Sequence, residues 1–125
     1  MIRIGILEHE KETKDIVFAL AKVFDGMDWT FRHFYKASQL AKASQNTEFQ
    51  IFIFDEMFKT PRFESVFVHD HPNAVIIYLC TDPKNVKQED CRSRIFYLAK
   101  ANLYDQVQAI AESLLAQVQQ ADSIC

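Results

Sequence analysis

The stretch "FQIFIF", residues 49–54, limits the folds open to this chain more than any other feature. Five of its six residues are apolar and bulky, and four of them follow one another directly. Successive side chains of a strand point to opposite faces of its sheet, so such a strand is buried on both faces. The run "NAVIIYLC", residues 73–80, has the same character. Strands of this kind are typical of parallel sheets with helices on each side.

Three further strands and three helical segments are expected around these two runs. The strands are predicted at residues 2–7, 29–35 and 94–99. Segments 11–24 and 103–119 carry apolar residues at helical spacing, and 36–45 is expected to form a short helix or turn. Gly26 is placed to end the first helix in the left-handed cap conformation. The pattern predicts one α/β domain over residues 1–120, a doubly wound five-stranded parallel sheet, with a tail at 121–125.

Composition argues against several classes of function. The net charge of −3 over 125 residues gives no support for bulk attraction to nucleic acid or anionic lipid. The chain has only two glycines, Gly5 and Gly26, and neither lies in a phosphate-binding loop, which argues against dinucleotide and P-loop sites. No apolar run reaches the roughly 20 residues that span a bilayer. Three cysteines without paired spacing indicate free thiols in a reducing compartment, so we expect a cytoplasmic protein.

The candidate site residues lie at the ends of four of the five expected strands. Ligands of open α/β sheets bind outside the carboxyl ends of the strands, so these residues are the candidate site. They are Glu8, His9 and Glu10 after the first strand, Asp55 and Glu56 after the third, Cys80, Thr81 and Asp82 after the fourth, and Lys100 after the fifth.

This set of residues resembles the receiver domain of bacterial two-component response regulators, in particular the LytR/AgrA type, over residues 2–118. In that family an acid pair follows the first strand, a phosphoacceptor aspartate ends the third, a hydroxyl residue ends the fourth, and a lysine follows the fifth. Lys100 stands 20 positions after Cys80, as in the LytR/AgrA type, and an aromatic residue precedes it by three. The matching segments are "ILEHE" with Glu8 and His9, "IFIFDE" with Asp55, "IIYLC" with Cys80 and then Thr81, and "YLAKA" with Tyr97 and Lys100.

The resemblance implies a flavodoxin-like fold with strand order 2-1-3-4-5 and a regulatory module that is not an enzyme. Asp55 would accept a phosphoryl group from a sensor histidine kinase, and Lys100 would bind a phosphoryl oxygen. Mg²⁺ would be held by oxygen ligands, which it prefers. The resemblance further implies a homodimer, and a C-terminal DNA-binding domain that would carry any contact with DNA. The metal ligands would be Glu8, His9, Asp55 and the backbone carbonyl of Met57, and the switch residues Cys80 or Thr81 and Tyr97.

Several positions depart from the family pattern. His9 replaces the principal metal-binding aspartate, and imidazole suits Mg²⁺ poorly, so we expect a weakened metal site. Cys80 offers a thiol, a weaker hydrogen-bonding group than a hydroxyl. Ala101 replaces the proline after the lysine, and the fourth helical segment, residues 82–93, is almost wholly polar. These departures favour an alternative, a pseudo-receiver that acts through protein contacts without phosphorylation. A phosphatase of the Asp-x-Asp type is disfavoured because residue 57 is Met57.

Simpler interpretations remain for the same residues. Asp55 could be a solvated strand end, and Lys100 a surface lysine at the start of the last helix. Residues 8–10 could only complement a helix dipole. The pair His69 and His71 could bind a metal, although a loop entering the fourth strand fits better. Finally, part of the phenylalanine excess could form an exposed patch for a partner at Phe58, Phe63 and Phe67.

Overall fold

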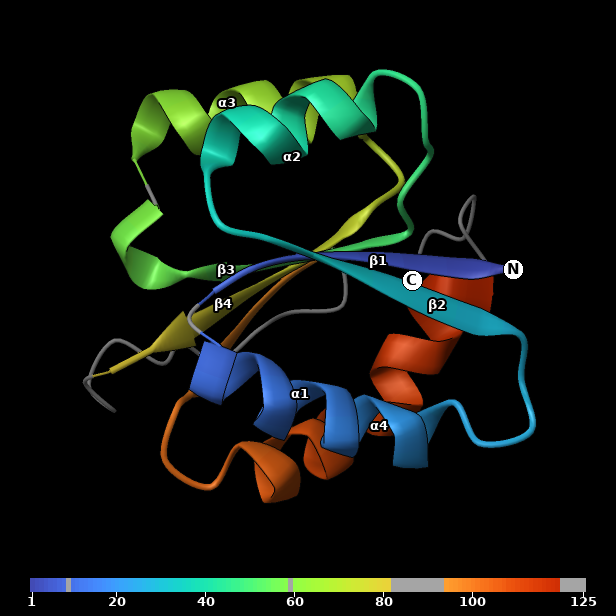
Figure 1. Cartoon of the computed structure of the whole chain (residues 1–125). Helices are drawn as coiled ribbons and strands as arrows, with labels where there is room; N and C mark the ends of the chain where they lie inside the picture. Colours follow the sequence, from blue (N-terminus) through green and yellow to red (C-terminus); the bar gives the residue numbers. More distant parts are fainter. Residues whose placement is uncertain (9, 59, 82–93, 120–125) are drawn as a thin grey trace.

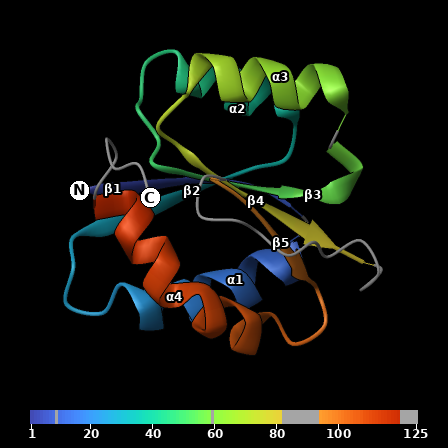
Figure 2. The same cartoon turned by 180° about the vertical axis from the view of Figure 1, so that it is seen from behind.

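The computed structural model describes residues 1–8, 10–58, 60–81 and 94–119 of the chain. Its strands form one sheet between two layers of helices (Figures 1 and 2). The elements in chain order are β1 (Ile2–Leu7), α1 (Glu10–Val23), β2 (Trp29–Phe34), α2 (Ala37–Ser44), β3 (Ile51–Asp55), the short 3₁₀ helix η1 (Glu56–Phe58), α3 (Pro61–Asp70), β4 (Val75–Cys80), β5 (Ile95–Ala99) and α4 (Leu103–Gln119).

The five strands are parallel and lie in the order β2-β1-β3-β4-β5, which confirms the expected fold class and strand order. The register pairs Leu7 with Phe54, Asp55 with Leu79, and Cys80 with Ala99. The carboxyl ends of β1, β3, β4 and β5 therefore meet at one rim of the sheet. Of the candidate residues, Glu8, Asp55, Cys80 and Lys100 lie at this rim, whereas His9 and Asp82 lie outside the described residues.

The sheet separates two hydrophobic cores. On one side α1 and α4 cover the even-numbered residues of β1 and the odd-numbered residues of β3, among them Ile4, Ile6 and Ile53. On the other side α2 and α3 cover side chains such as Phe52 and Tyr78. The interior strands β3 and β4 are buried at every position. Residues 51–54 and 75–79 enter one core or the other, and Asp55 and Cys80 are buried at the strand ends. This is the burial that the apolar run at residues 49–54 predicts.

Two glycines have distinct reasons for their small size. Gly26 has φ of 79°, so it ends α1 in the left-handed conformation that the sequence predicts. Gly5 lies inside β1, where an added Cβ would be 2.9 Å from Leu40 Cδ1 of α2 and 3.5 Å from Phe49 Cδ1. Gly5 thus lets the second helical layer approach the sheet closely.

The expected exposed patch of phenylalanines is wrong where it can be judged. Phe67 is 6% exposed and packs in the core against Phe52 and Phe54, with ring centroids 5.3 Å away in each case. Phe58 is partly buried against the same core. Among the residues whose exposure the structure describes, the exposed large aromatic side chains are Phe18, Phe31, Tyr35 and Tyr104.

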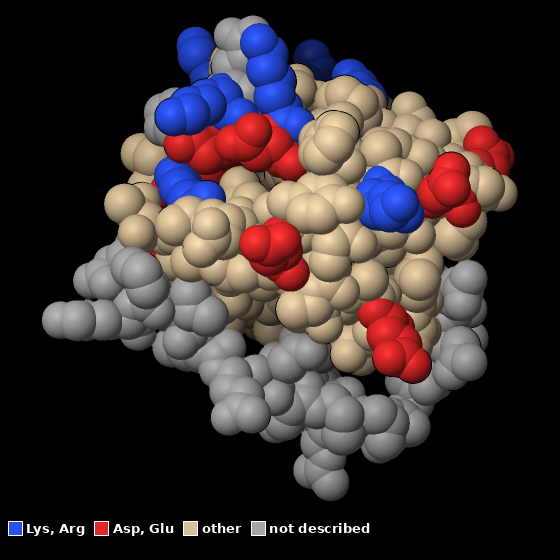
Figure 3. Space-filling model, turned by 90° about the horizontal axis from the view of Figure 1, so that it is seen from below, with Lys and Arg blue, Asp and Glu red and all other residues tan. Residues whose placement is uncertain are grey.

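The surface over α1 and α4 carries basic side chains beside acidic ones (Figure 3). The basic side chains gather along one edge of this face, with acidic side chains directly beside them (Figure 3). In the described ranges, no helix is long and apolar enough to cross a membrane.

Candidate functional site

The site lies at the carboxyl rim of the sheet, on the side covered by α1 and α4. Ile4 and Ile6 of β1, Ile53 of β3, and Phe96 and Leu98 of β5 all face that side. Side chains of a strand alternate, so Glu8, Asp55 and Lys100 continue the same three rows at the strand ends. The sequence therefore delivers two acids and one amine to one side of the sheet.

Asp55 is the last residue of β3 and is only 5% exposed, so it is not a solvated strand end. Its Oδ1 accepts a hydrogen bond from the Met57 backbone N–H at 2.9 Å. Its Oδ2 accepts a hydrogen bond from the Lys100 ammonium. The 3₁₀ turn after β3 supplies the first of these bonds, because it folds the Met57 amide back over the end of the strand.

Lys100 is held in place by its backbone as well as by its charge. Its backbone N–H donates to the carbonyl of Cys80 at 2.8 Å, which extends the β4–β5 pairing by one step. Its side chain is 16% exposed, and Nζ lies 3.7 Å from Glu8 Oε1 in addition to its contact with Asp55. Lys100 is therefore a partner of both acids, and the interpretation as a surface lysine is wrong.

Glu8 completes the cluster from the end of β1. The residue is 5% exposed, and the Glu8 side chain also interacts with the Asp55 carboxylate. Two carboxyl groups face one ammonium in this cluster. A buried cluster with that balance favours the uptake of either a proton or a cation.

The electrostatics keep Asp55 ionised and Lys100 charged. Burial by itself would raise the pKa of Asp55, but the bonds from Lys100 and the Met57 amide and the contact with Glu8 outweigh burial, so this pKa lies below its ordinary value. Burial would likewise lower the pKa of Lys100, but the hydrogen bond to Asp55 and the charges of Glu8, Asp55 and Glu12 raise it overall. Asp55 is thus a carboxylate at neutral pH, as a nucleophile requires.

The second acid after β3 has a structural role that the sequence did not reveal. Glu56 Oε1 accepts a hydrogen bond from the Thr81 backbone N–H at 2.9 Å. This bond ties the end of β3 to the residue after β4. Asp55 and Glu56 therefore have different roles. Asp55 binds Lys100, and Glu56 connects the ends of β3 and β4.

Two of the expected switch residues, Cys80 and Tyr97, lie on the opposite side of the sheet from Asp55, whereas Thr81 continues the row of Ile77 and Leu79 on the same side as Asp55. Cys80 is the last residue of β4 and is 1% exposed, whereas Thr81 is exposed. Tyr97 of β5 packs against the α2–α3 core and stacks on Tyr78, with ring centroids 5.5 Å apart. Of the two candidates at the end of β4, Cys80 is therefore the buried one.

Two further residues position the site, and sequence reasoning missed both. His33 of β2 donates from Nε2 to the backbone carbonyl of Glu8 at 2.6 Å, because a carbonyl can only accept. Gln106 of α4 accepts from the Ala99 N–H at 2.8 Å and donates to the Ala101 carbonyl at 3.0 Å, so it holds the turn around Lys100. The strand-end rule does not select His33, because this residue lies inside β2, and nothing in the sequence marks Gln106.

A Mg²⁺ ion fits the donors of this site in part. Glu8 and Asp55 offer carboxyl oxygens, the ligands that this hard cation prefers. However, the described residues contain no group of three or more His, Cys, Asp or Glu side chains that could hold a metal. His9 lies outside the described residues, and its role and that of the Met57 carbonyl stay predictions.

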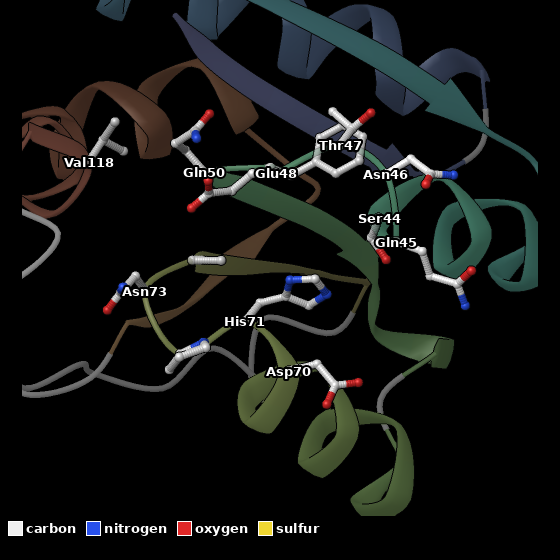
Figure 4. Close-up of a pocket in the computed structure, with 13 residues that line it drawn as sticks. Ser44, Gln45, Asn46, Thr47, Glu48, Gln50, Asp70, His71, Asn73 and Val118 are labelled. Carbon is white, nitrogen blue, oxygen red and sulfur yellow. The ribbon is translucent and has the colours of Figure 1, made fainter.

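A cavity lies at the other rim of the sheet (Figure 4). Its volume is about 650 Å³, and none of the expected site residues lines it. His71 lies in its wall, with its ring 4.9 Å from that of Phe52 and 5.7 Å from that of Phe67. His69 lies in α3 with 87% of its side chain exposed, so the expected loop begins only after this helix, and a metal pair with His71 stays a prediction. The remaining lining residues come from segments 44–50 and 70–74 and from Val118.

Comparison with solved structures supports the fold. The chain is similar to a two component transcriptional regulator AraC from Clostridium phytofermentans, with 14% identity, a TM-score of 0.70, and coverage of 99% of this chain and 100% of that one. It is similar to the signal receiver domain of an HD domain-containing protein from Pseudomonas fluorescens, with 16% identity, a TM-score of 0.64, and coverage of 98% and 93%.

A third similar structure is the RcsB response regulator of Salmonella typhimurium, with 11% identity, a TM-score of 0.62, and coverage of 96% of this chain and 67% of that one. No family model matches the sequence, and no curated protein matches it. At these identities the likeness shows that the chain shares the fold of receiver domains.

Proposed function

We propose that this chain is the receiver domain of a two-component response regulator and that Asp55 accepts the phosphoryl group. The observation that supports this most is the ion pair between a buried, ionised Asp55 and Lys100 at the carboxyl rim of a receiver-type sheet. The similarity to solved receiver domains adds support from the fold.

The proposed reaction is a phosphoryl transfer onto the Asp55 carboxylate. An Asp55 oxygen attacks the phosphorus of the donor, the bond from phosphorus to the donor breaks, and the donor keeps that electron pair. The lowered pKa of Asp55 keeps the nucleophile ionised at neutral pH. Lys100 then exchanges its bond with the carboxylate for one with a phosphoryl oxygen, a charge-assisted contact of similar strength. Mg²⁺ bound by Glu8 and Asp55 would offset the repulsion between the two anions.

The proposed response passes through the ends of β4 and β5. Lys100 is bonded to the Cys80 carbonyl through its own amide, so movement of its side chain is coupled to the end of β4. Cys80 and Tyr97 face the α2–α3 layer, where Tyr97 stacks on Tyr78. We expect phosphorylation to change this stacking, which would be the two-state element of the switch.

The finer parts of the proposal follow the LytR/AgrA resemblance. Residues 1–120 would form the receiver unit, residues 121–125 would begin a linker, and a DNA-binding effector domain would follow in the full-length product. The phosphodonor would be a sensor histidine kinase, which places the protein in the cytoplasm. Any dimer contact through the fourth helical segment, residues 82–93, lies outside the described residues.

A second candidate function is a pseudo-receiver whose state is set by a protein partner. The observation that favours it is the cluster itself, because Lys100 already contacts both Asp55 and Glu8. The buried thiol at Cys80, in place of a hydroxyl, also favours this candidate. In that case the ion pair would stabilise the fold and would not open for a phosphoryl group.

Incubation with acetyl phosphate and Mg²⁺, followed by intact mass measurement, tests the proposal. We expect one phosphoryl adduct on the wild-type chain, none on Asp55→Asn, and one on Glu56→Gln, the adjacent acid that serves as the matched control. Amide spectra recorded during a titration with Mg²⁺ and beryllofluoride should shift around residue 55. Absence of both the adduct and saturable shifts at high Mg²⁺ would overturn the phosphoacceptor role and leave the pseudo-receiver.

A further inference from the structure

We propose that two copies of this chain associate through their β2 strands, which pair antiparallel across a twofold axis centred on Thr30. The proposal is independent of the phosphoacceptor function and uses the edge of the sheet opposite to β5. Its basis is that the exposed edge of β2 is complementary to itself in one particular register.

The β2 strand is an open edge whose side chains are largely exposed. Within the described residues it pairs only with β1. Thr30, Phe31 and Arg32 are exposed, and Phe31 retains 39% of its accessible surface. The other edge strand, β5, is half-buried or buried at every position. Exposed edges invite pairing with another chain, and β2 has no proline, lysine or bulge to prevent it.

The backbone of β2 decides which registers are possible. The Ile2 N–H donates to the Asp28 carbonyl at 2.9 Å, so Asp28 faces β1, and in a parallel ladder Thr30 and Arg32 face it as well. The residues between them, Trp29 and Phe31, direct their N–H and C=O groups to the open edge. An added antiparallel strand must bond to these outward residues, which allows only registers that pair odd positions with odd positions.

Charge and aromatic contacts select one of these registers. With Thr30 opposite Thr30 of the second copy, Asp28 of each copy lies opposite Arg32 of the other, and Trp29 lies opposite Phe31. Opposite charges, aromatic pairs and threonine pairs are all favourable cross-strand combinations. The register centred on Arg32 would place two arginines against each other, and the register centred on Phe31 would leave Asp28 opposite Phe34. The segment "DWTFR", residues 28–32, is thus complementary to a second copy of itself that runs in the opposite direction.

The side chains already stand in rows that suit this pairing. Trp29 and Phe31 are on the α1 side with rings 6.2 Å apart, so the pairing would join two such pairs into one aromatic cluster. Arg32 lies on the α2 side over the Phe34 ring, 5.1 Å from its centroid, and reaches along the strand. The pairing would cover these exposed rings and satisfy the open backbone groups.

Charge reversal tests the register. Sedimentation equilibrium should show a dimer for the wild-type chain. Arg32→Asp and Asp28→Arg each place like charges opposite one another twice, so each should raise the dissociation constant about tenfold or more. The double variant Asp28→Arg/Arg32→Asp restores both pairs and should return the constant to within about threefold of wild type. Lys11→Asp, an exposed site on α1 with the same change in charge, serves as the control and should have no effect.

Crosslinking gives a second, direct measurement. Opposed residues that do not exchange backbone bonds have Cα atoms about 4.5 Å apart, within reach of a disulfide. In a background with Cys91→Ser and Cys125→Ser, Thr30→Cys should form a crosslinked dimer on mild oxidation, whereas Arg32→Cys should not. A monomer at all concentrations, a double variant no better than the single ones, or equal crosslinking at positions 30 and 32 would each overturn the proposal.

Discussion

Replacing Lys100 by methionine leaves two buried acids without their cation. Asp55 and Glu8 are each 5% exposed, and the methionine has a similar length but no charge. Removing one partner of a buried ion pair costs about 3–5 kcal/mol, because the remaining charge is desolvated and unpaired. The Lys100 side chain is 16% exposed and the Met57 amide still binds Asp55, so we expect about 3 kcal/mol, the lower end of that range.

The second substitution in this test should restore stability rather than reduce it further. Asp55→Asn removes one of the two acids that Lys100→Met leaves unpaired, and its amide can donate to Glu8. We therefore expect the double variant Asp55→Asn/Lys100→Met to be more stable than Lys100→Met alone, with a coupling energy of about 1–2 kcal/mol. Lys22→Met, an exposed lysine at the end of α1, is the control and should change stability by less than about 0.5 kcal/mol.

Urea unfolding followed by circular dichroism measures these differences. With a slope of about 2 kcal/mol per molar urea, Lys100→Met should lower the midpoint by about 1.5 M. The difference in stability between wild type and Lys100→Met should shrink as the pH falls, because the unpaired Asp55 of the variant takes up a proton. The wild-type ion pair loses its stabilising effect when the pH falls below 3.8 through the lowered pKa of Asp55. A double variant less stable than Lys100→Met, or a Lys100→Met midpoint equal to wild type, would refute the reasoning.

Three further predictions concern the rest of the fold. Burial lowers the pKa of His71, although the charges of Asp70 and Glu48 oppose this shift. Wild-type stability should therefore fall as the pH drops below 6.5, and thermal unfolding of His71→Gln should depend less on pH. Gly5→Ala should cost about 1–2 kcal/mol in urea unfolding, because its Cβ would press on Leu40 Cδ1, and a smaller residue at position 40 should reduce that cost. Gly26→Ala should cost about 1 kcal/mol although the space is open, since φ of 79° strains any residue with a Cβ, and thermal unfolding would show it.

The sheet was predictable because the pattern that indicates it lies in a few consecutive residues. Residues in β3 and β4 are apolar at consecutive positions, and only a sheet with two cores satisfies that pattern. The same regularity placed Glu8, Asp55 and Lys100 at one rim, since each follows a strand whose direction was already known. Their closeness therefore needed only the strand order, which the family resemblance supplied.

Contacts set by side-chain conformation were out of reach of the sequence. Gln106 holds the turn at Lys100 because its amide reaches the carbonyl of Ala101, a contact that no local sequence pattern indicates. Phe67 was misjudged because α3 turns that residue toward Phe52 and Phe54, and neither the length nor the tilt of a short helix can be read from its sequence. The role of Glu56 likewise depends on where the chain goes after β4.

Side chains of β3 and β5 alternate strictly between the two faces of the sheet, and this has a consequence for the proposed switch. The acids occupy one layer and the stacked tyrosines Tyr78 and Tyr97 the other, so an event at Asp55 must cross the thickness of the sheet to be felt. In the proposed switch, mutations of Tyr78 or Tyr97 should then abolish the conformational response while phosphorylation of Asp55 proceeds unchanged. Variants that cannot accept the phosphoryl group and variants that do not respond to it should therefore map to opposite sides of the sheet.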